Sequence, residues 1–118
     1  MVIRFLARVV QYGNNNKPLL AVVTLSADKE LLSVSPFISE TDHTTYYDGL
    51  LLITSPLLDV SAIDAFVNRS TCINELIESL QYCRCQVSYG ERCRIYHISN
   101  IDWADFRFTP DSVVSVVV

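Results

Sequence analysis

The sequence is poor in the residues that several classes of protein need in quantity. Only 3 of its 118 residues are glycine, which leaves no glycine-rich loop of the kind that wraps around a phosphate. Its nine basic residues are outnumbered by thirteen acidic ones and are dispersed, with only Arg84, Arg92 and Arg94 near one another. Because binding to a phosphate backbone requires clustered positive charge, we expect no nucleic-acid partner.

Long apolar runs are also missing. No segment approaches the roughly 18 consecutive apolar residues that a membrane-spanning helix needs. The first ten residues, MVIRFLARVV, are interrupted by Arg4 and Arg8 and lack a small-residue cleavage site, so they do not resemble a secretory signal. These absences predict a soluble, cytoplasmic protein with no membrane association.

The four cysteines are too few for a disulfide scaffold, and a chain of this size can be stable without such cross-links. Structural zinc sites usually pair their ligands as Cys-x2-Cys, because that spacing lets two thiolates converge from one turn, whereas Cys83 and Cys85 are separated by a single residue. We therefore interpret the cysteines as buried and reduced, with zinc binding or a redox pair as the alternatives. Cys85 and Cys93 are expected to face each other across a turn at Gly90.

The two histidines lie far apart in the sequence, and neither sits in a ligand motif. His97 shares a predicted strand face with Cys93 and is interpreted as a core or rim residue. Glu40, Asp42 and His43 fall within four residues, which invites an acid–base or metal site, but such a cluster before a turn is more typical of a solvated loop. We assign no catalytic residue and no cofactor. The alternative metal ligands are Cys83, Cys85, Cys93, His43 and His97.

Half of the residues are apolar and 19% are charged, which is typical of a folded globular chain. A length of 118 residues suits one domain with one core. We predict a single domain, residues 1–118, with a mostly-β α+β fold. It comprises N-terminal strands (1–56), a helical insert (60–84) and C-terminal strands (85–118), and the two sets of strands form a small β-sandwich.

The sequence of the first half of the chain predicts strands joined by turns. Residues 2–12 are rich in β-branched and aromatic types and end at YGNNNKP, which favours a loop. Residues 19–25 and 31–37 predict a second hairpin. TTYY and LLLI flank Asp48-Gly49, a strong signal for a two-residue hairpin turn.

The pattern then changes to helical spacing. Ser61 and Asp64 resemble a capping box at the start of a short helix. Thr71 is the expected cap of a second helix. Its apolar stripe, which we expect to cover one face of the sheet, consists of Ile73, Leu76, Ile77 and Leu80.

Strand character returns in the last third of the chain. We predict strands over 85–89 and 92–99 with a turn near Gly90, another turn at Thr109-Pro110-Asp111, and a closing strand, SVVSVVV. This last strand is flat and uncharged, so we expect it to be a sheet edge that needs covering.

One stretch, YYDGLLLITSPLLDVSA, resembles a junction in the amidohydrolase (metal-dependent hydrolase) superfamily. There a short strand leads into Pro-Gly-aliphatic-aliphatic-Asp-x-His-x-His. With the two patterns aligned on Leu57-Leu58-Asp59, the Pro-Gly pair falls on Ser55-Pro56. The two metal-binding histidines fall on Ser61 and Ile63, so both ligands are absent.

Two further stretches are similar to the ends of those enzymes. GERCRIYHISNIDWADFRFTPDSVVSVVV resembles their C-terminal strands, and LARVV through DKELLSVSPF resembles their N-terminal strands. In that family the two terminal segments form a small accessory β-sandwich beside the catalytic barrel. The barrel needs about 250 residues, and only about 40 separate the matching ends here. The resemblance implies the accessory sandwich without the barrel, and hence without the catalytic groups.

The implied function is non-catalytic: a stand-alone sandwich protein that acts through self-association, as a homodimer, or by binding another protein. Two alternatives stay open. The first is a small metal-binding or ligand-binding protein that uses the cysteines with His43 or His97. The second is an enzyme with a new site that includes Glu40, Asp42 and His43.

Overall fold

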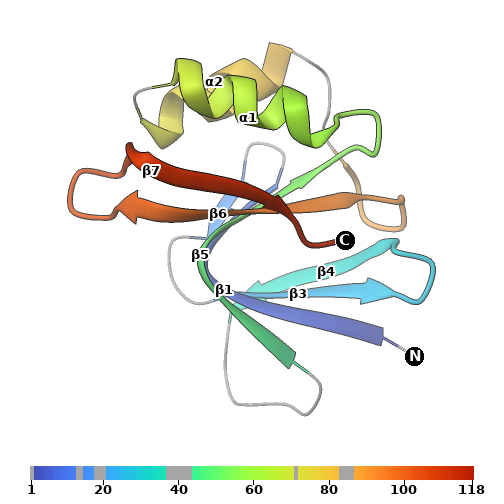
Figure 1. Cartoon of the computed structure of the whole chain (residues 1–118). Coiled ribbons are helices and arrows are strands. Elements are labelled where there is room, and N and C mark those ends of the chain that lie inside the picture. Colours follow the sequence, from blue (N-terminus) through green and yellow to red (C-terminus); the bar gives the residue numbers. More distant parts are fainter. Residues whose placement is uncertain (1, 13–14, 18–20, 37–43, 71, 83–86) are drawn as a thin grey trace.

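Strands of one sheet make up most of the structure, a computed structural model that describes residues 2–12, 15–17, 21–36, 44–70, 72–82 and 87–118 (Figure 1). In chain order the elements are β1 (Val2–Tyr12), β2 (Asn15–Lys17), β3 (Ala21–Ser26), β4 (Leu31–Pro36), β5 (Thr44–Thr54), α1 (Val60–Arg69), α2 (Ile73–Tyr82), β6 (Arg94–Asp102) and β7 (Arg107–Val116). The two helices lie between β5 and β6. This order confirms the predicted mostly-β α+β fold with two inserted helices.

The sheet has the strand order β4-β3-β1-β5-β6-β7, and β2 pairs with the end of β1. β1 and β5 are parallel, and the other neighbouring strands are antiparallel. The N-terminal and C-terminal strands therefore share the sheet and meet where β5 pairs with β6. In Figure 1 the sheet bends so that β3 and β4 lie beneath β6 and β7, so one continuous sheet produces the sandwich-like shape.

Backbone hydrogen bonds join the two ends of this bend. The N–H of Leu31, at the start of β4, donates to the Glu91 carbonyl at 2.8 Å, and the Gly90 N–H donates to the Leu31 carbonyl at 2.7 Å. The Cys93 N–H donates to the Lys29 carbonyl at 3.1 Å. The segment that leads into β6 thus returns to the β3–β4 hairpin and brings the sheet close to a closed barrel.

Two apolar cores lie on opposite sides of the sheet. The core inside the bend contains Phe5, Ala7, Val10, Ala21, Val23, Leu25, Leu31, Val34, Leu51, Ile53, Val87, Cys93 and Ile95. The core under the helices contains Val9, Leu50, Leu52, Ile63, Val67, Ile73, Leu76, Leu80, Tyr96, Ile98 and Ile101. β5 supplies alternate residues to both cores. Because both of its faces are buried, its sequence is the unbroken run LLLI and does not alternate with polar residues.

The helices cover the outer side of the sheet. The predicted apolar stripe of α2 is confirmed, since Ile73, Leu76 and Leu80 are buried in the second core and Ile77 packs against it. The predicted cap of α1 is wrong: Asp59, not Ser61, is the N-cap, and its carboxylate accepts a hydrogen bond from the Ala62 N–H at 2.9 Å. Thr71 lies outside the described residues. Neither described helix is long and apolar enough to cross a bilayer.

The predicted hairpin at Asp48-Gly49 is wrong. β5 runs through both residues, because the segment before them pairs in parallel with β1 and does not fold back on the segment after them. The register steps from Ala7 opposite Tyr47 to Val9 opposite Leu50, so β5 holds one extra residue there, which makes a β-bulge. Bulges and type I′ turns both favour glycine at a positive φ, so the dipeptide alone does not distinguish them.

The turn predicted at Thr109-Pro110-Asp111 is also wrong. The chain reverses earlier, at residues 103–106, and the tripeptide lies inside β7. Between the pairs Ser99–Val113 and Ile101–Phe108 the register shifts, with the extra residues on β7, so the tripeptide forms a bulge.

Two shorter segments differ from the prediction as well. Residues 15–17 form β2 where a loop was expected, because they pair with the end of β1. Residues 87 and 88 are not in a strand, and the rest of the predicted strand at 85–89 divides between a turn and residues outside the described part.

Candidate functional site

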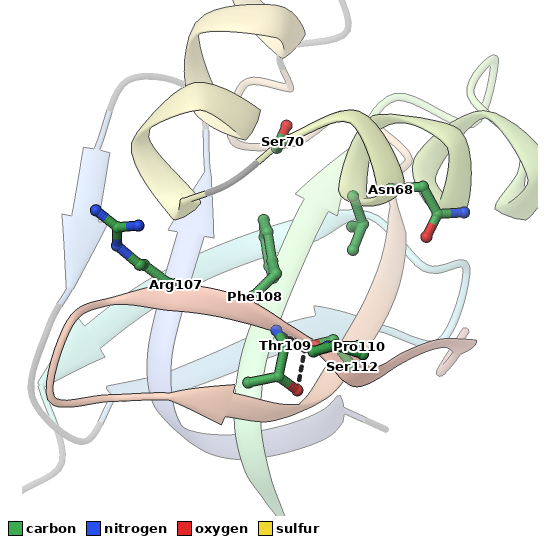
Figure 2. A pocket seen from close by; sticks show the side chains of 8 residues that line it. Asn68, Ser70, Arg107, Phe108, Thr109, Pro110 and Ser112 are labelled. Atoms are coloured by element: carbon green, nitrogen blue, oxygen red, sulfur yellow. Dashed lines mark hydrogen bonds between the residues drawn. The ribbon is translucent and has the colours of Figure 1, made fainter.

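A groove runs between α1 and β7, at the edge of the sheet (Figure 2). One part of it is a pocket of about 380 Å³ lined by Val67, Asn68, Ser70, Arg107, Phe108, Thr109, Pro110 and Ser112. A second part, of about 350 Å³, is lined by Val60, Ser61, Asp64, Ser112, Val113 and Val114. Since Ser112 lines both parts, we treat them as one site, the α1–β7 groove.

The position of α1 follows from its amphipathic sequence. Ile63 and Val67 are buried in the second core and hold the helix against the sheet. The Ser70 N–H donates to the Phe66 carbonyl at 3.0 Å and ends the helix. One exposed stripe of the helix is therefore left along β7, and it consists of Val60, Ser61, Asp64 and Asn68.

The β7 side of the groove is shaped by the Thr109–Ser112 bulge, which Asn100 of β6 holds in place. The Asn100 carbonyl accepts hydrogen bonds from the Thr109 hydroxyl at 2.8 Å and the Ser112 hydroxyl at 2.9 Å. Its side-chain amide donates to the Asp111 carbonyl at 3.0 Å. The N–H groups of Thr109 and Asp111 donate to the Ser112 and Thr109 hydroxyls at 2.9 and 3.2 Å. Polar groups of the bulge are thus satisfied within the chain.

The outer edge of β7 is open beyond this bulge. β7 is the last strand in the sheet order, and at its first residue Arg107 forms an isolated bridge with Cys72. No other strand of the described part pairs with its outer side from Ser112 to Val116. This stretch has no charged residue, and Val113 and Val116 are 54% and 48% exposed. An uncharged edge with exposed valines is a template for an added strand.

The two ends of the groove differ in chemistry. The part near the C-terminal end of α1 has one cationic side chain, Arg107, and none of the described residues lining it is acidic. Figure 2 shows Arg107 and Asn68 on opposite sides of this part, with Phe108 directed toward the helix layer. The other part has three valines, at 60, 113 and 114, with Asp64 beside them.

The predicted metal ligands are not brought together among the described residues. Cys83, Cys85 and His43 lie outside that part of the chain, as do Glu40 and Asp42. In the described part no group of three or more His, Cys, Asp or Glu side chains could hold a metal ion.

Cys93 is buried in the core inside the bend, with 5% of its surface exposed, and its Sγ atom lies 3.7 Å from the Lys29 carbonyl. Burial raises the pKa of this thiol from 9.0 to about 11. Because the thiolate is both the nucleophile and the metal ligand, Cys93 is poorly suited to either role at neutral pH.

His97 is half-buried on β6. Its Nε2 atom lies 2.9 Å from the Asp48 carbonyl oxygen, and its ring is 5.1 Å from that of Tyr47. It thus lies at the rim of the core inside the bend, next to the β5 bulge.

The two positions aligned with the histidines of the amidohydrolase family both lie on α1. Ile63 is fully buried in the second core, whereas Ser61 is exposed and lines the α1–β7 groove. The groove itself was not predicted. A proline within a strand is confined to edges and bulges, so Pro110 was the signal that could have identified β7 as a bulged edge strand.

Comparisons with protein-family models, with curated proteins and with solved structures gave no match to this chain.

Proposed function

We propose that this protein is a non-catalytic binding module that acts through the edge of β7, where an extended segment of another chain adds as a further strand. One observation carries the proposal: the stretch Ser112–Val116 is an uncharged edge that no strand of the described part covers, and it lies beside a groove. Self-association and binding of a different protein are the two ways in which such an edge is used.

Strand addition combines two sources of affinity. Main-chain hydrogen bonds to the edge contribute about 0.5 to 1.5 kcal/mol each, whatever the sequence of the incoming segment. Pockets beside the edge then select its side chains. The helix α1 supplies one wall of these pockets, through Val60, Ser61, Asp64 and Asn68.

The alternative of a metal-binding protein is supported less well, because Cys93 is buried as a thiol and the other proposed cysteine ligands lie outside the described residues. Descent from an amidohydrolase accessory sandwich stays a prediction that rests on the sequence resemblance alone.

The test compares two exposed positions on the two edge strands of the sheet. Val113→Lys places a charge on the β7 edge, and Leu32→Lys places the same charge on β4, where Leu32 is 44% exposed. A library of displayed random peptides is selected against the unmodified protein, and light scattering measures self-association. We expect peptide binding or dimer formation that Val113→Lys abolishes and Leu32→Lys preserves. A monomer with no Val113-dependent binding contradicts the proposal.

A further inference from the structure

We infer that the α1–β7 groove selects an extended segment of a different protein that carries an acidic side chain at the Arg107 end and an aliphatic side chain at the Val113 end. The inference rests on the proposed function and adds the chemistry of the partner. Three features carry it: the charge at one end of the groove, the apolar lining at the other, and the inability of a second copy to satisfy both.

Asp102 is the cross-strand partner of Arg107, but its carboxylate accepts hydrogen bonds from the N–H groups of Ala104 and Asp105 and does not line the Arg107 end of the groove. Arg107 forms no ion pair with another residue of the described part, and no acidic side chain there lines its pocket. The hydroxyls of Thr109 and Ser112 already donate to the Asn100 carbonyl. Donors available to a ligand therefore come mainly from the Arg107 guanidinium and the Asn68 amide, a combination that suits a carboxylate.

The other end suits an aliphatic side chain. Val60 of α1 and the β7 residues Val113 and Val114 line it, and Val60 and Val113 are both exposed. An aliphatic group that enters this pocket removes its own surface and that of the valines from water, which is worth about 25 cal/mol per Å² of apolar area. Asp64 lies beside the valines and disfavours a second acidic residue at this end.

The distance between the two ends sets the spacing in the partner. Arg107 and Val113 are six positions apart on β7 (113 − 107), and the bulge shortens the path between them. At about 3.3 Å per residue, an extended partner spans the two ends with roughly four to six residues.

A second copy of β7 does not supply this pattern. The acidic residue of β7 is Asp111. If two copies of β7 paired antiparallel with Asp111 of one copy opposite Arg107 of the other, the pairing would be centred on Thr109, midway between the two residues. The N–H groups of Thr109 and Asp111 are already bonded to side chains of the bulge. Self-pairing centred on Ser112, at the start of the open stretch, places Val117 opposite Arg107 and supplies no carboxylate there.

The experiment uses displayed random peptides of about ten residues, roughly 33 Å when extended, selected against the whole chain. We expect the selected peptides to be enriched in Asp or Glu, with an aliphatic residue about four to six positions away. This separation follows from the rise of about 3.3 Å per residue in an extended chain. A synthetic consensus peptide is then measured by fluorescence polarisation. Arg107→Glu should weaken its binding at least about tenfold, the lower range for a hydrogen bond to a charged group. Arg92→Glu, at an exposed arginine outside the groove, is the matched control and should leave binding unchanged.

A peptide with Lys in place of its acidic residue should bind Arg107→Glu better than it binds the unmodified protein. This reversal shows that the variant is folded and that the contact is electrostatic. The inference is overturned if peptides whose binding depends on Val113 show no preference for an acidic residue, or if they bind Arg107→Glu as well as the unmodified protein. Either result leaves the proposed function standing. Dimer formation without Val113-dependent peptide binding makes the second copy the occupant and overturns the inference. If the protein neither forms a dimer nor binds peptides through Val113, the proposed function is overturned as well.

Discussion

The imidazole Nε2 atom of His97 lies 2.9 Å from the main-chain carbonyl oxygen of Asp48, a residue 49 positions earlier in the chain. Since a carbonyl only accepts, Nε2 carries the proton in this contact. The adjacent Gly49 has a φ of 145°, and a Cβ atom there would lie 2.8 Å from His97 Nε2 and 2.5 Å from the Ile98 carbonyl oxygen. The bulge in β5 thus allows β6 to approach closely only because residue 49 has no side chain.

Gly49→Ala is expected to destabilise the fold by about 2 to 4 kcal/mol, because it adds backbone strain and a collision with main-chain atoms of β6. Gly90→Ala is the matched control: Gly90 also has a positive φ, 89°, but a Cβ there meets no atom within 4 Å. Gly90→Ala should therefore lower the free energy of unfolding only by the backbone strain, about 1 kcal/mol. Urea unfolding measures both variants, and equal losses of stability would disprove the close approach of β6 at Gly49.

Asp59→Ala should destabilise the protein by about 1 kcal/mol, because the substitution removes the carboxylate that caps α1. Ser61→Ala, at the position that the sequence pattern favoured as the cap, should change the stability by less than about 0.5 kcal/mol. The two substitutions are compared by thermal unfolding. A larger effect at Ser61 than at Asp59 would place the start of the helix at Ser61.

Asn100 combines a positive φ of 58° with the hydrogen bonds that hold the β7 bulge. Asn100→Gly removes the amide and keeps the backbone relaxed, whereas Asn100→Ala removes the amide and adds about 1 kcal/mol of left-handed strain. We expect the glycine variant to lose about 1 kcal/mol for the hydrogen bond and the alanine variant about twice that. Denaturant midpoints give both values. Identical midpoints for the two variants would mean that the backbone at residue 100 is not left-handed.

Stability is expected to fall in alkaline solution through Cys93. Because burial raises the pKa of this thiol from 9.0 to about 11, the unfolded chain loses its proton at a lower pH than the folded chain does. The stabilising contribution is therefore complete below pH 9.0 and is lost as the pH rises toward 11. Tyr96 acts in the same direction, since burial raises its pKa above 10.0 although Arg94 opposes the shift.

Cys93→Ala tests this assignment. The variant should lose less stability between pH 9 and pH 11 than the unmodified chain does, whatever its stability at neutral pH. The comparison uses urea midpoints at the two pH values. An unchanged pH dependence would show that the thiol is not protected from solvent in the folded protein.

Local sequence patterns correctly predicted the elements that are determined by residues close together in the chain. The stripe Ile73, Leu76, Ile77 and Leu80 fixes which side of α2 is buried, and the β3–β4 hairpin joins strands that are neighbours in sequence. The errors occurred where a distant segment overrides a local preference. Asp48-Gly49 favours a hairpin by itself but forms a bulge, because β1 pairs with the residues on both sides of it.

The candidate site was predictable only in part. The uncharged composition of SVVSVVV indicated an edge strand, and β7 is the outermost strand of the sheet. The groove beside it could not be predicted, because it depends on where α1 lies relative to a strand that follows it by almost 40 residues (107 − 69 = 38). Arg107 belongs to no motif in the sequence and becomes part of the proposed site only through this placement.

The hydrogen bonds between Leu31 and the Gly90–Glu91 turn have a consequence for biosynthesis. They join segments about 60 residues apart (90 − 31 = 59), and contacts of such high sequence separation form late because a long loop must close first. A nascent chain that has emerged only as far as α2 exposes unpaired edges on both β4 and β5. Its inner core then lacks Val87, Cys93 and Ile95. The inner core and the free edge of β5 are therefore completed only when the last quarter of the chain is present.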